Sequence, residues 1–393
     1  MYQQPRIKNI EKYLRELPIN TLKIDLSECG LTELPDLSQF TELQILFCNN
    51  NNLTILPVFN KSLVSINCSY NEIKEVPEFN EKLETFICSY NKIEILPAFN
   101  KNLKIIHCNH NQIRELPEFN ENLIDVYCNN NEIKSLPEFN EKLETFVCCN
   151  NEIERVPEFN ENLKTFICSY NKIRELPEFN DNLIEIYCQN NQIKSLPEFN
   201  ENLRHLTCNN NRIRKLPKFN ENLRHVTCNN NKIRKLPKLN KKLLSITCCY
   251  NEISSLPPFN EDLISIKCSH NYLTSLPPFN ENLLLIDCSY NYIFYITQIN
   301  DMLKTLTYSN NEIYEVIDSY NINVIKDKNK IINKFKTLYY SLRCKTQLKD
   351  WLWKRVREPK IKQYYSPENL MQLLNTLNDE NDEDELDEVV NKW

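Results

Sequence analysis

The sequence predicts a curved solenoid with one parallel β-sheet of about 15 short strands, one from each sequence repeat. The first observation is a 20-residue repeat that runs without insertion from Leu43 to Val316. The second is a short segment in every repeat where apolar residues alternate, as in a strand with one buried face. Because so short a unit cannot bury an apolar core by itself, neighbouring repeats have to stack.

Residues 81–100 show the first half of a repeat. Leu83, Phe86 and Cys88 supply the buried side of the expected strand. Asn91 follows where the chain has to turn. Its side-chain amide can pair with backbone groups that the turn would otherwise leave buried without a partner.

The second half of the repeat is expected to be extended. Pro97 excludes a central strand and favours a polyproline-like backbone on the convex side. Phe99 and its equivalents then close the core from that side. The predicted fold is therefore a sheet on one face and extended chain on the other.

The spacing L-x-x-L-x-L-x-x-N-x-L-x-x-L, followed by proline, resembles the leucine-rich repeat pattern. Fourteen copies carry the asparagine, from Asn51 to Asn311, and one degenerate copy at residues 24–35 precedes them. The resemblance implies a leucine-rich repeat solenoid, a curved horseshoe of a kind that mostly forms binding surfaces.

Two narrower resemblances follow. The repeat length and the Leu-Pro dipeptide are similar to the LPX class of leucine-rich repeats in secreted bacterial effectors, although L-P-E-F-N replaces the second Leu-Pro. The segments W-L-W-K-R-V-R-E-P-K and Y-S-P-E-N-L within residues 351–370, and the abundance of Asn, Ile, Lys and Tyr, resemble leucine-rich repeat proteins of giant DNA viruses related to mimivirus. That likeness implies a host or viral protein as the partner.

Four regions are expected along the chain: an N-terminal helical cap at 1–20, the solenoid at 21–316, a basic helical C-terminal region at 317–378 and an acidic tail at 379–393. Residues 6–16 are predicted as the N-terminal helix. Apolar residues at helical spacing, among them Ile331 and Phe335, predict a basic amphipathic helix that caps the other end.

Composition excludes several classes of protein. A single glycine, Gly30, leaves no glycine-rich phosphate loop, which excludes Walker-type NTPases, Rossmann dinucleotide binding and protein kinases. No apolar run is long enough to span a membrane, and the N-terminal segment has no secretory pattern, so an intracellular, cytoplasmic monomer with reduced thiols is expected.

Catalytic motifs are missing, and the region after Val316 is too short for the ligase domain of some LPX effectors. The sequence therefore predicts a non-enzyme without cofactor or metal.

Thirteen cysteines recur every 20 residues from Cys48 to Cys288. Their spacing does not fit a zinc site, and a column of buried thiols is the expectation. Cys149 and Cys249 alternate with that column, so they are predicted to point outward and to be the more reactive thiols.

The residues that alternate with the buried strand positions are expected to line the concave face and to bind a protein partner. All five histidines, including His270, are assigned to this face. His205 and His225 are one strand apart but lack a third metal ligand. The candidate partner-binding residues are Tyr90, His107, His110, Tyr127, Tyr187, His205, His225 and Lys267.

A basic stripe at residues 201–242 contains 12 Lys or Arg residues against two acidic ones. It supports an alternative function, binding of nucleic-acid phosphates, although few aromatic residues are interleaved; a simple solvated edge is the other interpretation. A second alternative is a substrate adaptor for a ubiquitin ligase, by family analogy. The stripe includes Arg212, Arg214, Lys215, Arg234 and Lys235.

Overall fold

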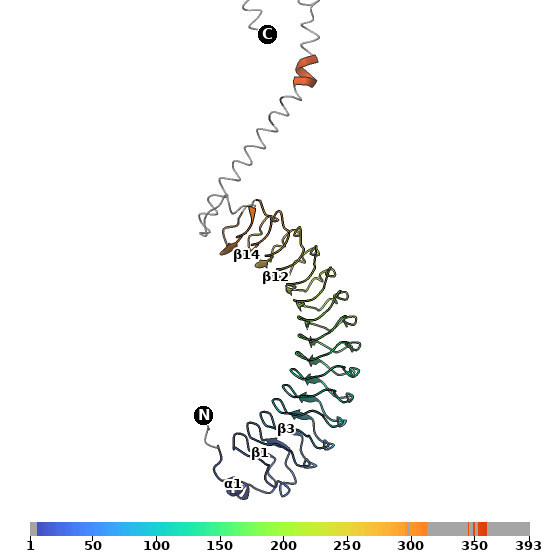
Figure 1. The fold of residues 1–393 in the computed structure, drawn as a ribbon, viewed down its shortest axis with the longest axis vertical. Helices are drawn as coiled ribbons and strands as arrows, with labels where there is room; N and C mark the ends of the chain where they lie inside the picture. Colours follow the sequence, from blue (N-terminus) through green and yellow to red (C-terminus); the bar gives the residue numbers. More distant parts are fainter. Residues whose placement is uncertain are drawn as a thin grey trace, which may run out of the picture. The chain divides into compact units, whose positions relative to one another are not determined.

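The computed structural model describes residues 6–294, 296, 299–312, 345, 349 and 353–359. The chain divides into two compact units, Met1–Ile325 and Lys326–Trp393. The first unit contains the solenoid (Figure 1). In the second, the described residues include a π-helix, η2, at Trp353–Arg357. The predicted C-terminal helix around Ile331 and Phe335 and the acidic tail at 379–393 lie outside the described residues.

Fifteen three-residue strands form one parallel sheet in the described part of the chain, and their order in space follows the sequence. This confirms the predicted fold class. The strands are β1 Lys23–Asp25, β2 Ile45–Phe47, β3 Ser65–Asn67, β4 Thr85–Ile87, β5 Ile105–His107, β6 Asp125–Tyr127, β7 Thr145–Val147, β8 Thr165–Ile167, β9 Glu185–Tyr187, β10 His205–Thr207, β11 His225–Thr227, β12 Ser245–Thr247, β13 Ser265–Lys267, β14 Leu285–Asp287 and β15 Thr305–Thr307.

The core is a set of columns in which equivalent residues of successive repeats touch. In β8 the central residue, Phe166, is fully buried, while Thr165 and Ile167 on either side are half-buried. The register places each strand directly beside its equivalent, 20 residues along the chain. Cys88 and the other column cysteines from Cys48 to Cys288 have no exposed surface, which confirms the buried thiol column.

Asn91 joins two repeats through its side chain, as the turn position predicts. Its Nδ2 donates to the carbonyl oxygens of Cys68 and Cys88, both at 3.0 Å, and its Oδ1 accepts from the amide of Ile73 at 3.0 Å. Equivalent bonds recur from Asn71 to Asn291. The ladder pairs buried backbone groups at the carboxyl end of every strand.

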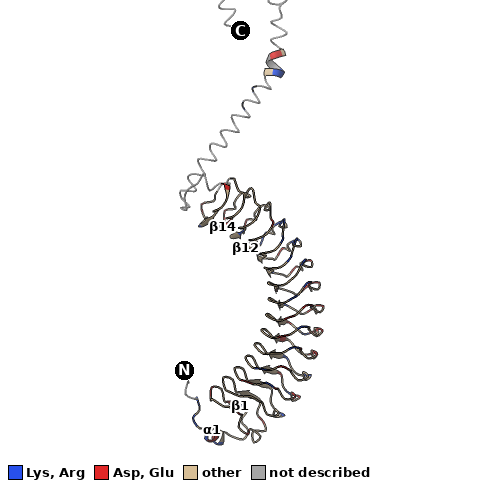
Figure 2. Ribbon diagram, in the orientation of Figure 1, with Lys and Arg blue, Asp and Glu red and all other residues tan. Residues whose placement is uncertain are grey.

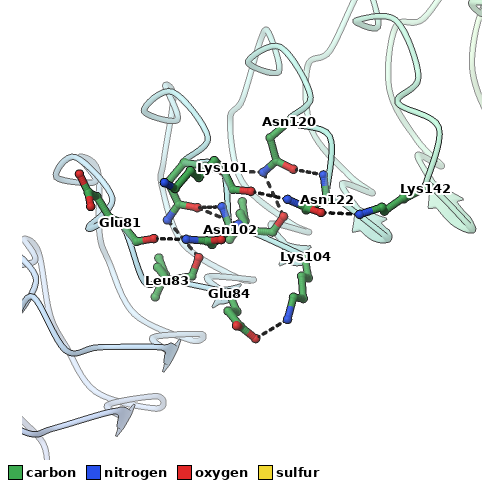
Figure 3. A network of polar contacts seen from close by, with 11 residues as sticks. Glu81, Leu83, Glu84, Lys101, Asn102, Lys104, Asn120, Asn122 and Lys142 are labelled. Carbon is green, nitrogen blue, oxygen red and sulfur yellow. Dashed lines mark hydrogen bonds and ion pairs between the residues drawn. The ribbon is translucent and has the colours of Figure 1, made fainter.

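A second asparagine ladder was not predicted. Asn120 donates to the carbonyls of Asn100 at 2.6 Å and Leu103 at 3.0 Å, and its Oδ1 accepts from the amide of Asn122 at 2.7 Å (Figure 3). The same residue of other repeats makes equivalent bonds, as Asn100 and Asn220 do. The asparagine of this position, which follows Phe in most repeats, therefore secures the loop that precedes the strand.

The strands lie on the inner side of the curve and the extended segments, which carry the phenylalanine column, on the outer side (Figure 1). Phe99 stacks on Phe79 and Phe119 with ring centroids 6.3 Å apart. Near the end of the strand, the stacked rings of Tyr70 and Tyr90 are only 4.3 Å apart. Because the spacing between neighbouring repeats is larger at the phenylalanine column than near the strand ends, the stack of repeats has to curve. Phe99 is half-buried rather than buried, so the column closes the core only in part.

The N-terminal helix, α1, spans Ile10–Glu16 and begins four residues later than predicted. Asn9 is its N-cap: the side-chain oxygen accepts from the amide of Lys12 at 2.9 Å. Arg6 instead lies beside the first repeat, where its guanidinium contacts the carboxylate of Asp25 at 2.8 Å. The cap residue, which the apolar spacing alone does not reveal, sets the start of the helix.

Candidate functional site

The concave face is formed by the first and third residue of each strand, since the second is buried in β1 to β14. These side chains form two parallel columns across the sheet, because every strand pairs in register with the next. Most of them are half-buried, and Lys267 is exposed. Packing of the core does not restrict the identity of these residues, because only the central residue of each strand has to fill the core.

Several predicted residues meet on this face. His107 and Tyr127 pack edge to face with ring centroids 4.5 Å apart. His205 and His225 stack at 5.0 Å on neighbouring strands. Tyr187 registers with Thr207, and Lys267 registers with Asp287. The structure thus brings the candidates together in pairs rather than at one centre.

Burial and neighbouring charges alter the titration of these side chains. Burial lowers the pKa of His107, and Asp125 opposes that effect. The pKa of His225 is lowered by burial and by the positive charges of His205 and Arg224. The pKa values of Tyr127 and Tyr187 are raised, mainly by burial. At neutral pH these conditions favour uncharged rings, which suit a contact surface.

The assignment to the strand face is correct for His107, His205 and His225 but wrong for Tyr90, His110 and His270. Tyr90, His110 and His270 come three residues after their strands, at a turn residue with left-handed backbone. Fifteen non-glycine residues, one per repeat from Glu28 to Asn310, have this conformation. The alternation of a strand does not continue into that turn, so these side chains form a separate column.

Aromatic residues in the turn column stack on one another, which the sequence interpretation missed. Two groups of three occur, and ring centroids within them are 4.0–4.3 Å apart. The four tyrosines of these groups are between 42% and 51% exposed. The sequence pattern that could have predicted this stacking is a tyrosine or histidine directly before the ladder asparagine in consecutive repeats. The groups are Tyr70, Tyr90 and His110, and Tyr250, His270 and Tyr290.

The five named residues of the basic stripe lie outside the strands, in the segments after the ladder asparagines, whereas Arg204 and Arg224 of the same range directly precede β10 and β11. Figure 2 shows charged residues of both signs along the outer edge of the solenoid. Arg234 pairs with Glu252 at 2.9 Å. A groove across three repeats is lined by Arg214, Lys215, Arg234 and Lys235, with Glu198 also in its lining. Arg212 is exposed and is not part of the groove lining.

The prediction for the two additional cysteines is half wrong. Cys249 is buried, with 9% of its surface exposed, and Cys149 is half-buried. Their position follows the strand, where the next repeat covers the side chain: the Cys149 thiol lies 3.7 Å from the carbonyl oxygen of Ile167. Burial raises the pKa of Cys149. The prediction from the alternation of buried and exposed strand residues did not include the turn of the next repeat, which covers this side chain.

Within the described ranges, no group of three or more His, Cys, Asp or Glu side chains is arranged to hold a metal ion. His205 and His225 remain a pair. The same part of the chain contains no helix with the length and apolar character that crossing a bilayer requires.

One strand per 20-residue repeat, an asparagine ladder at the strand ends and an extended convex side together define a leucine-rich repeat solenoid. No family model and no curated protein sequence matches the chain. A structure of YopM, a leucine-rich effector protein from Yersinia pestis, is 26% identical; the match covers 73% of this chain and 88% of YopM, with a TM-score of 0.62.

Two further solved structures share the fold. A leucine-rich repeat protein from Leptospira interrogans is 23% identical, with 80% of this chain and 98% of that one covered and a TM-score of 0.62. The functional domain of InlJ from Listeria monocytogenes, described as including a cysteine ladder, is 21% identical, with 73% and 67% covered and a TM-score of 0.64. Bacterial leucine-rich repeat proteins are thus what this chain is similar to in structure.

Proposed function

We propose that the chain is a non-catalytic scaffold that recognises a protein partner through its concave sheet face. The observation that carries the proposal is the pair of side-chain columns on fifteen registered strands. Because the ladders and the core already fix the backbone, binding costs little ordering entropy. Tyrosine and arginine, which are enriched among energetically important interface residues, occur on or beside this face at Tyr127, Tyr187 and Arg204.

The setting of the scaffold is part of the proposal. We infer an intracellular monomer, with a host or viral protein as its partner, from the giant-virus and LPX resemblances of the repeats. The described cysteines are free thiols, which is compatible with a reducing compartment. The likeness to YopM, an effector by its description, supports an interaction role rather than a catalytic one.

Site-specific photo-crosslinking tests the proposal. A benzophenone amino acid is placed at Tyr127 or Tyr187 on the sheet, and at Ile95, which is 77% exposed outside the sheet, as the matched control. In lysate of the cells that produce the protein, treated with nuclease and at raised salt, we expect one protein to be captured from both sheet positions and not from Ile95. Capture from Ile95 alone, or adducts that nuclease removes, would contradict concave-face recognition and favour the outer basic stripe.

A substitution experiment complements the crosslinking. Replacing Tyr127, Tyr187 and His205 together with alanine should weaken the captured complex, since all three side chains lie on the sheet face. Circular dichroism of the variant shows whether the solenoid remains folded. Unchanged binding by a folded variant would move the site away from these strands.

A further inference from the structure

The residue before each strand forms a column in which acidic and basic side chains pair between neighbouring repeats. Lys104 contacts Glu84 at 2.8 Å (Figure 3), and Lys164 contacts Glu144 at 2.7 Å. In these two places the lysine is neutralised by the carboxylate one repeat earlier. The two basic repeats differ from these pairs.

Arg204 and Arg224 occupy the same column in neighbouring repeats, with the amide of Arg224 donating to the carbonyl of Arg204 at 2.9 Å. Both side chains are exposed. The column continues with Ile184 on one side and Leu244 on the other, so no acid of this column flanks them. Among the described residues, neither arginine forms an ion pair with a carboxylate. Two like charges on adjacent repeats therefore lie side by side without an ion pair to either of them.

The next residue of each repeat extends the cluster. His205 and His225 stack at 5.0 Å, and His225 Nδ1 lies 2.8 Å from the hydroxyl of Ser245. On the neighbouring strand β9, the titratable side chains are Glu185 and Tyr187, and Glu185 registers with His205. On the other side, β12 contributes the uncharged Ser245 and Thr247.

The lowered pKa of His225 agrees with this crowding. The charges of His205 and Arg224 add to burial in lowering the pKa of His225. A ligand that brings negative charge would reverse the effect and favour the protonated rings. The cluster would then offer two guanidinium groups and two imidazolium groups within two adjacent strands.

We propose that Arg204, Arg224, His205 and His225 form a phosphate-binding site on the concave face, which takes a phosphorylated side chain of the protein partner. An arginine guanidinium group can donate two parallel hydrogen bonds to two oxygens of one phosphate. Neighbouring strands are about 4.8 Å apart, so they present two guanidinium groups side by side. A phosphorylated side chain carries a charge of roughly −1.5 to −2 and three acceptor oxygens, so it can engage donors from both strands, whereas a carboxylate has one charge and two oxygens. This inference rests on the proposed recognition by the concave face.

The full-length protein with 13C-labelled histidine rings provides the direct test, since the chain has only five histidines. The probes are inorganic phosphate and the blocked peptide acetyl-Ala-phosphoserine-Ala-amide, with the unphosphorylated peptide for comparison. We expect the signals of His205 and His225 to shift and their pKa values to rise with both phosphate probes, while His107, His110 and His270 respond little.

Two charge-matched double variants separate this site from the outer stripe. Arg204→Gln/Arg224→Gln should weaken phosphopeptide binding about tenfold or more, because charge-assisted hydrogen bonds are lost. Arg212→Gln/Arg214→Gln removes the same charge from another part of the repeat and should leave binding unchanged. Equal loss in both variants, or equal shifts of all five histidines, would overturn the proposal. A (dT)12 oligonucleotide that binds more tightly than the phosphopeptide, with dependence on Arg212 and Arg214, would overturn it in favour of nucleic acid.

Phosphatase treatment of the lysate in the crosslinking experiment distinguishes failure of this inference from failure of the proposed function. Loss of capture at Tyr187 after phosphatase treatment supports the phosphate site. Capture that survives treatment, from a protein that still crosslinks at Tyr127 and Tyr187, retains concave-face recognition and rejects the phosphate site.

Discussion

Tyr90 stacks on His110 with ring centroids 4.0 Å apart and ring planes 12° apart, although both residues have left-handed backbone. That backbone costs roughly 1–2 kcal/mol for a residue with a large side chain, whereas asparagine tolerates it. Asparagine does occupy the position in seven of the fifteen repeats. Stacking between neighbouring aromatic rings therefore offsets a local backbone cost in six of the seven repeats that carry tyrosine or histidine there.

The substitution Tyr90→Asn tests this balance, with Tyr170→Asn as its matched control. Tyr90 stacks on both Tyr70 and His110, whereas Tyr170 stands between Asn150 and Asn190 and is 54% exposed. Both substitutions relieve the same backbone cost, but only the first removes aromatic pairs, each worth about 0.5–1.5 kcal/mol. We expect Tyr90→Asn to be less stable than Tyr170→Asn by about 1–3 kcal/mol in urea denaturation. Equal stability of the two variants would show that the stacks contribute nothing.

The inner asparagine ladder should be far more sensitive than the exposed asparagines. Asn171 Nδ2 donates to the carbonyls of Cys148 and Cys168, and its Oδ1 accepts from Ile153. Asn171→Ala leaves these buried backbone groups unpaired, at about 1–3 kcal/mol each. Asn182→Ala removes one exposed bond, to the carbonyl of Glu161, and should cost under about 1 kcal/mol. Thermal and urea unfolding of both variants measure the difference; a loss at Asn171 no larger than at Asn182 would rule out the assigned role.

The sequence was sufficient for the fold because one physical pattern repeats. Alternation fixes the buried strand residue, and the period fixes the register, so Cys88, Asn91 and the sheet follow directly. The second ladder, at Asn120, was missed because an asparagine after Phe also suits an ordinary polar turn. The backbone conformation at Tyr90 was missed because the alternation of side chains between the two faces of a strand ends at the last strand residue. The choice of partner-binding residues stays a prediction, since exposed strand residues are not constrained by the core.

Thiol reactivity should report the integrity of the solenoid. Burial raises the pKa of Cys48, Cys108 and Cys188 to about 12. At pH 8 only about one such group in ten thousand is the reactive thiolate. In a Cys344→Ser background, which removes the one cysteine outside the described residues, a thiol reagent should label native protein slowly and mainly at the half-buried Cys149. Labelling in guanidinium should reach all 16 remaining thiols. Full labelling of the native protein would disprove the buried column.

His107 should make the solenoid less stable as the pH falls. Burial against the neighbouring strands lowers its pKa below the ordinary value of 6.5, so the unfolded chain binds the proton more readily than the folded one. The stabilising contribution is therefore complete above pH 6.5 and is lost as the pH falls through the lower pKa of the folded state. His107→Gln cannot take up this proton, so the loss of stability between pH 7.5 and 5 should be smaller than in the parent protein.

His110, which is exposed in the turn column, supplies the control substitution, His110→Gln. Urea denaturation at several pH values gives the comparison, and an identical pH dependence in all three proteins would show that His107 titrates normally.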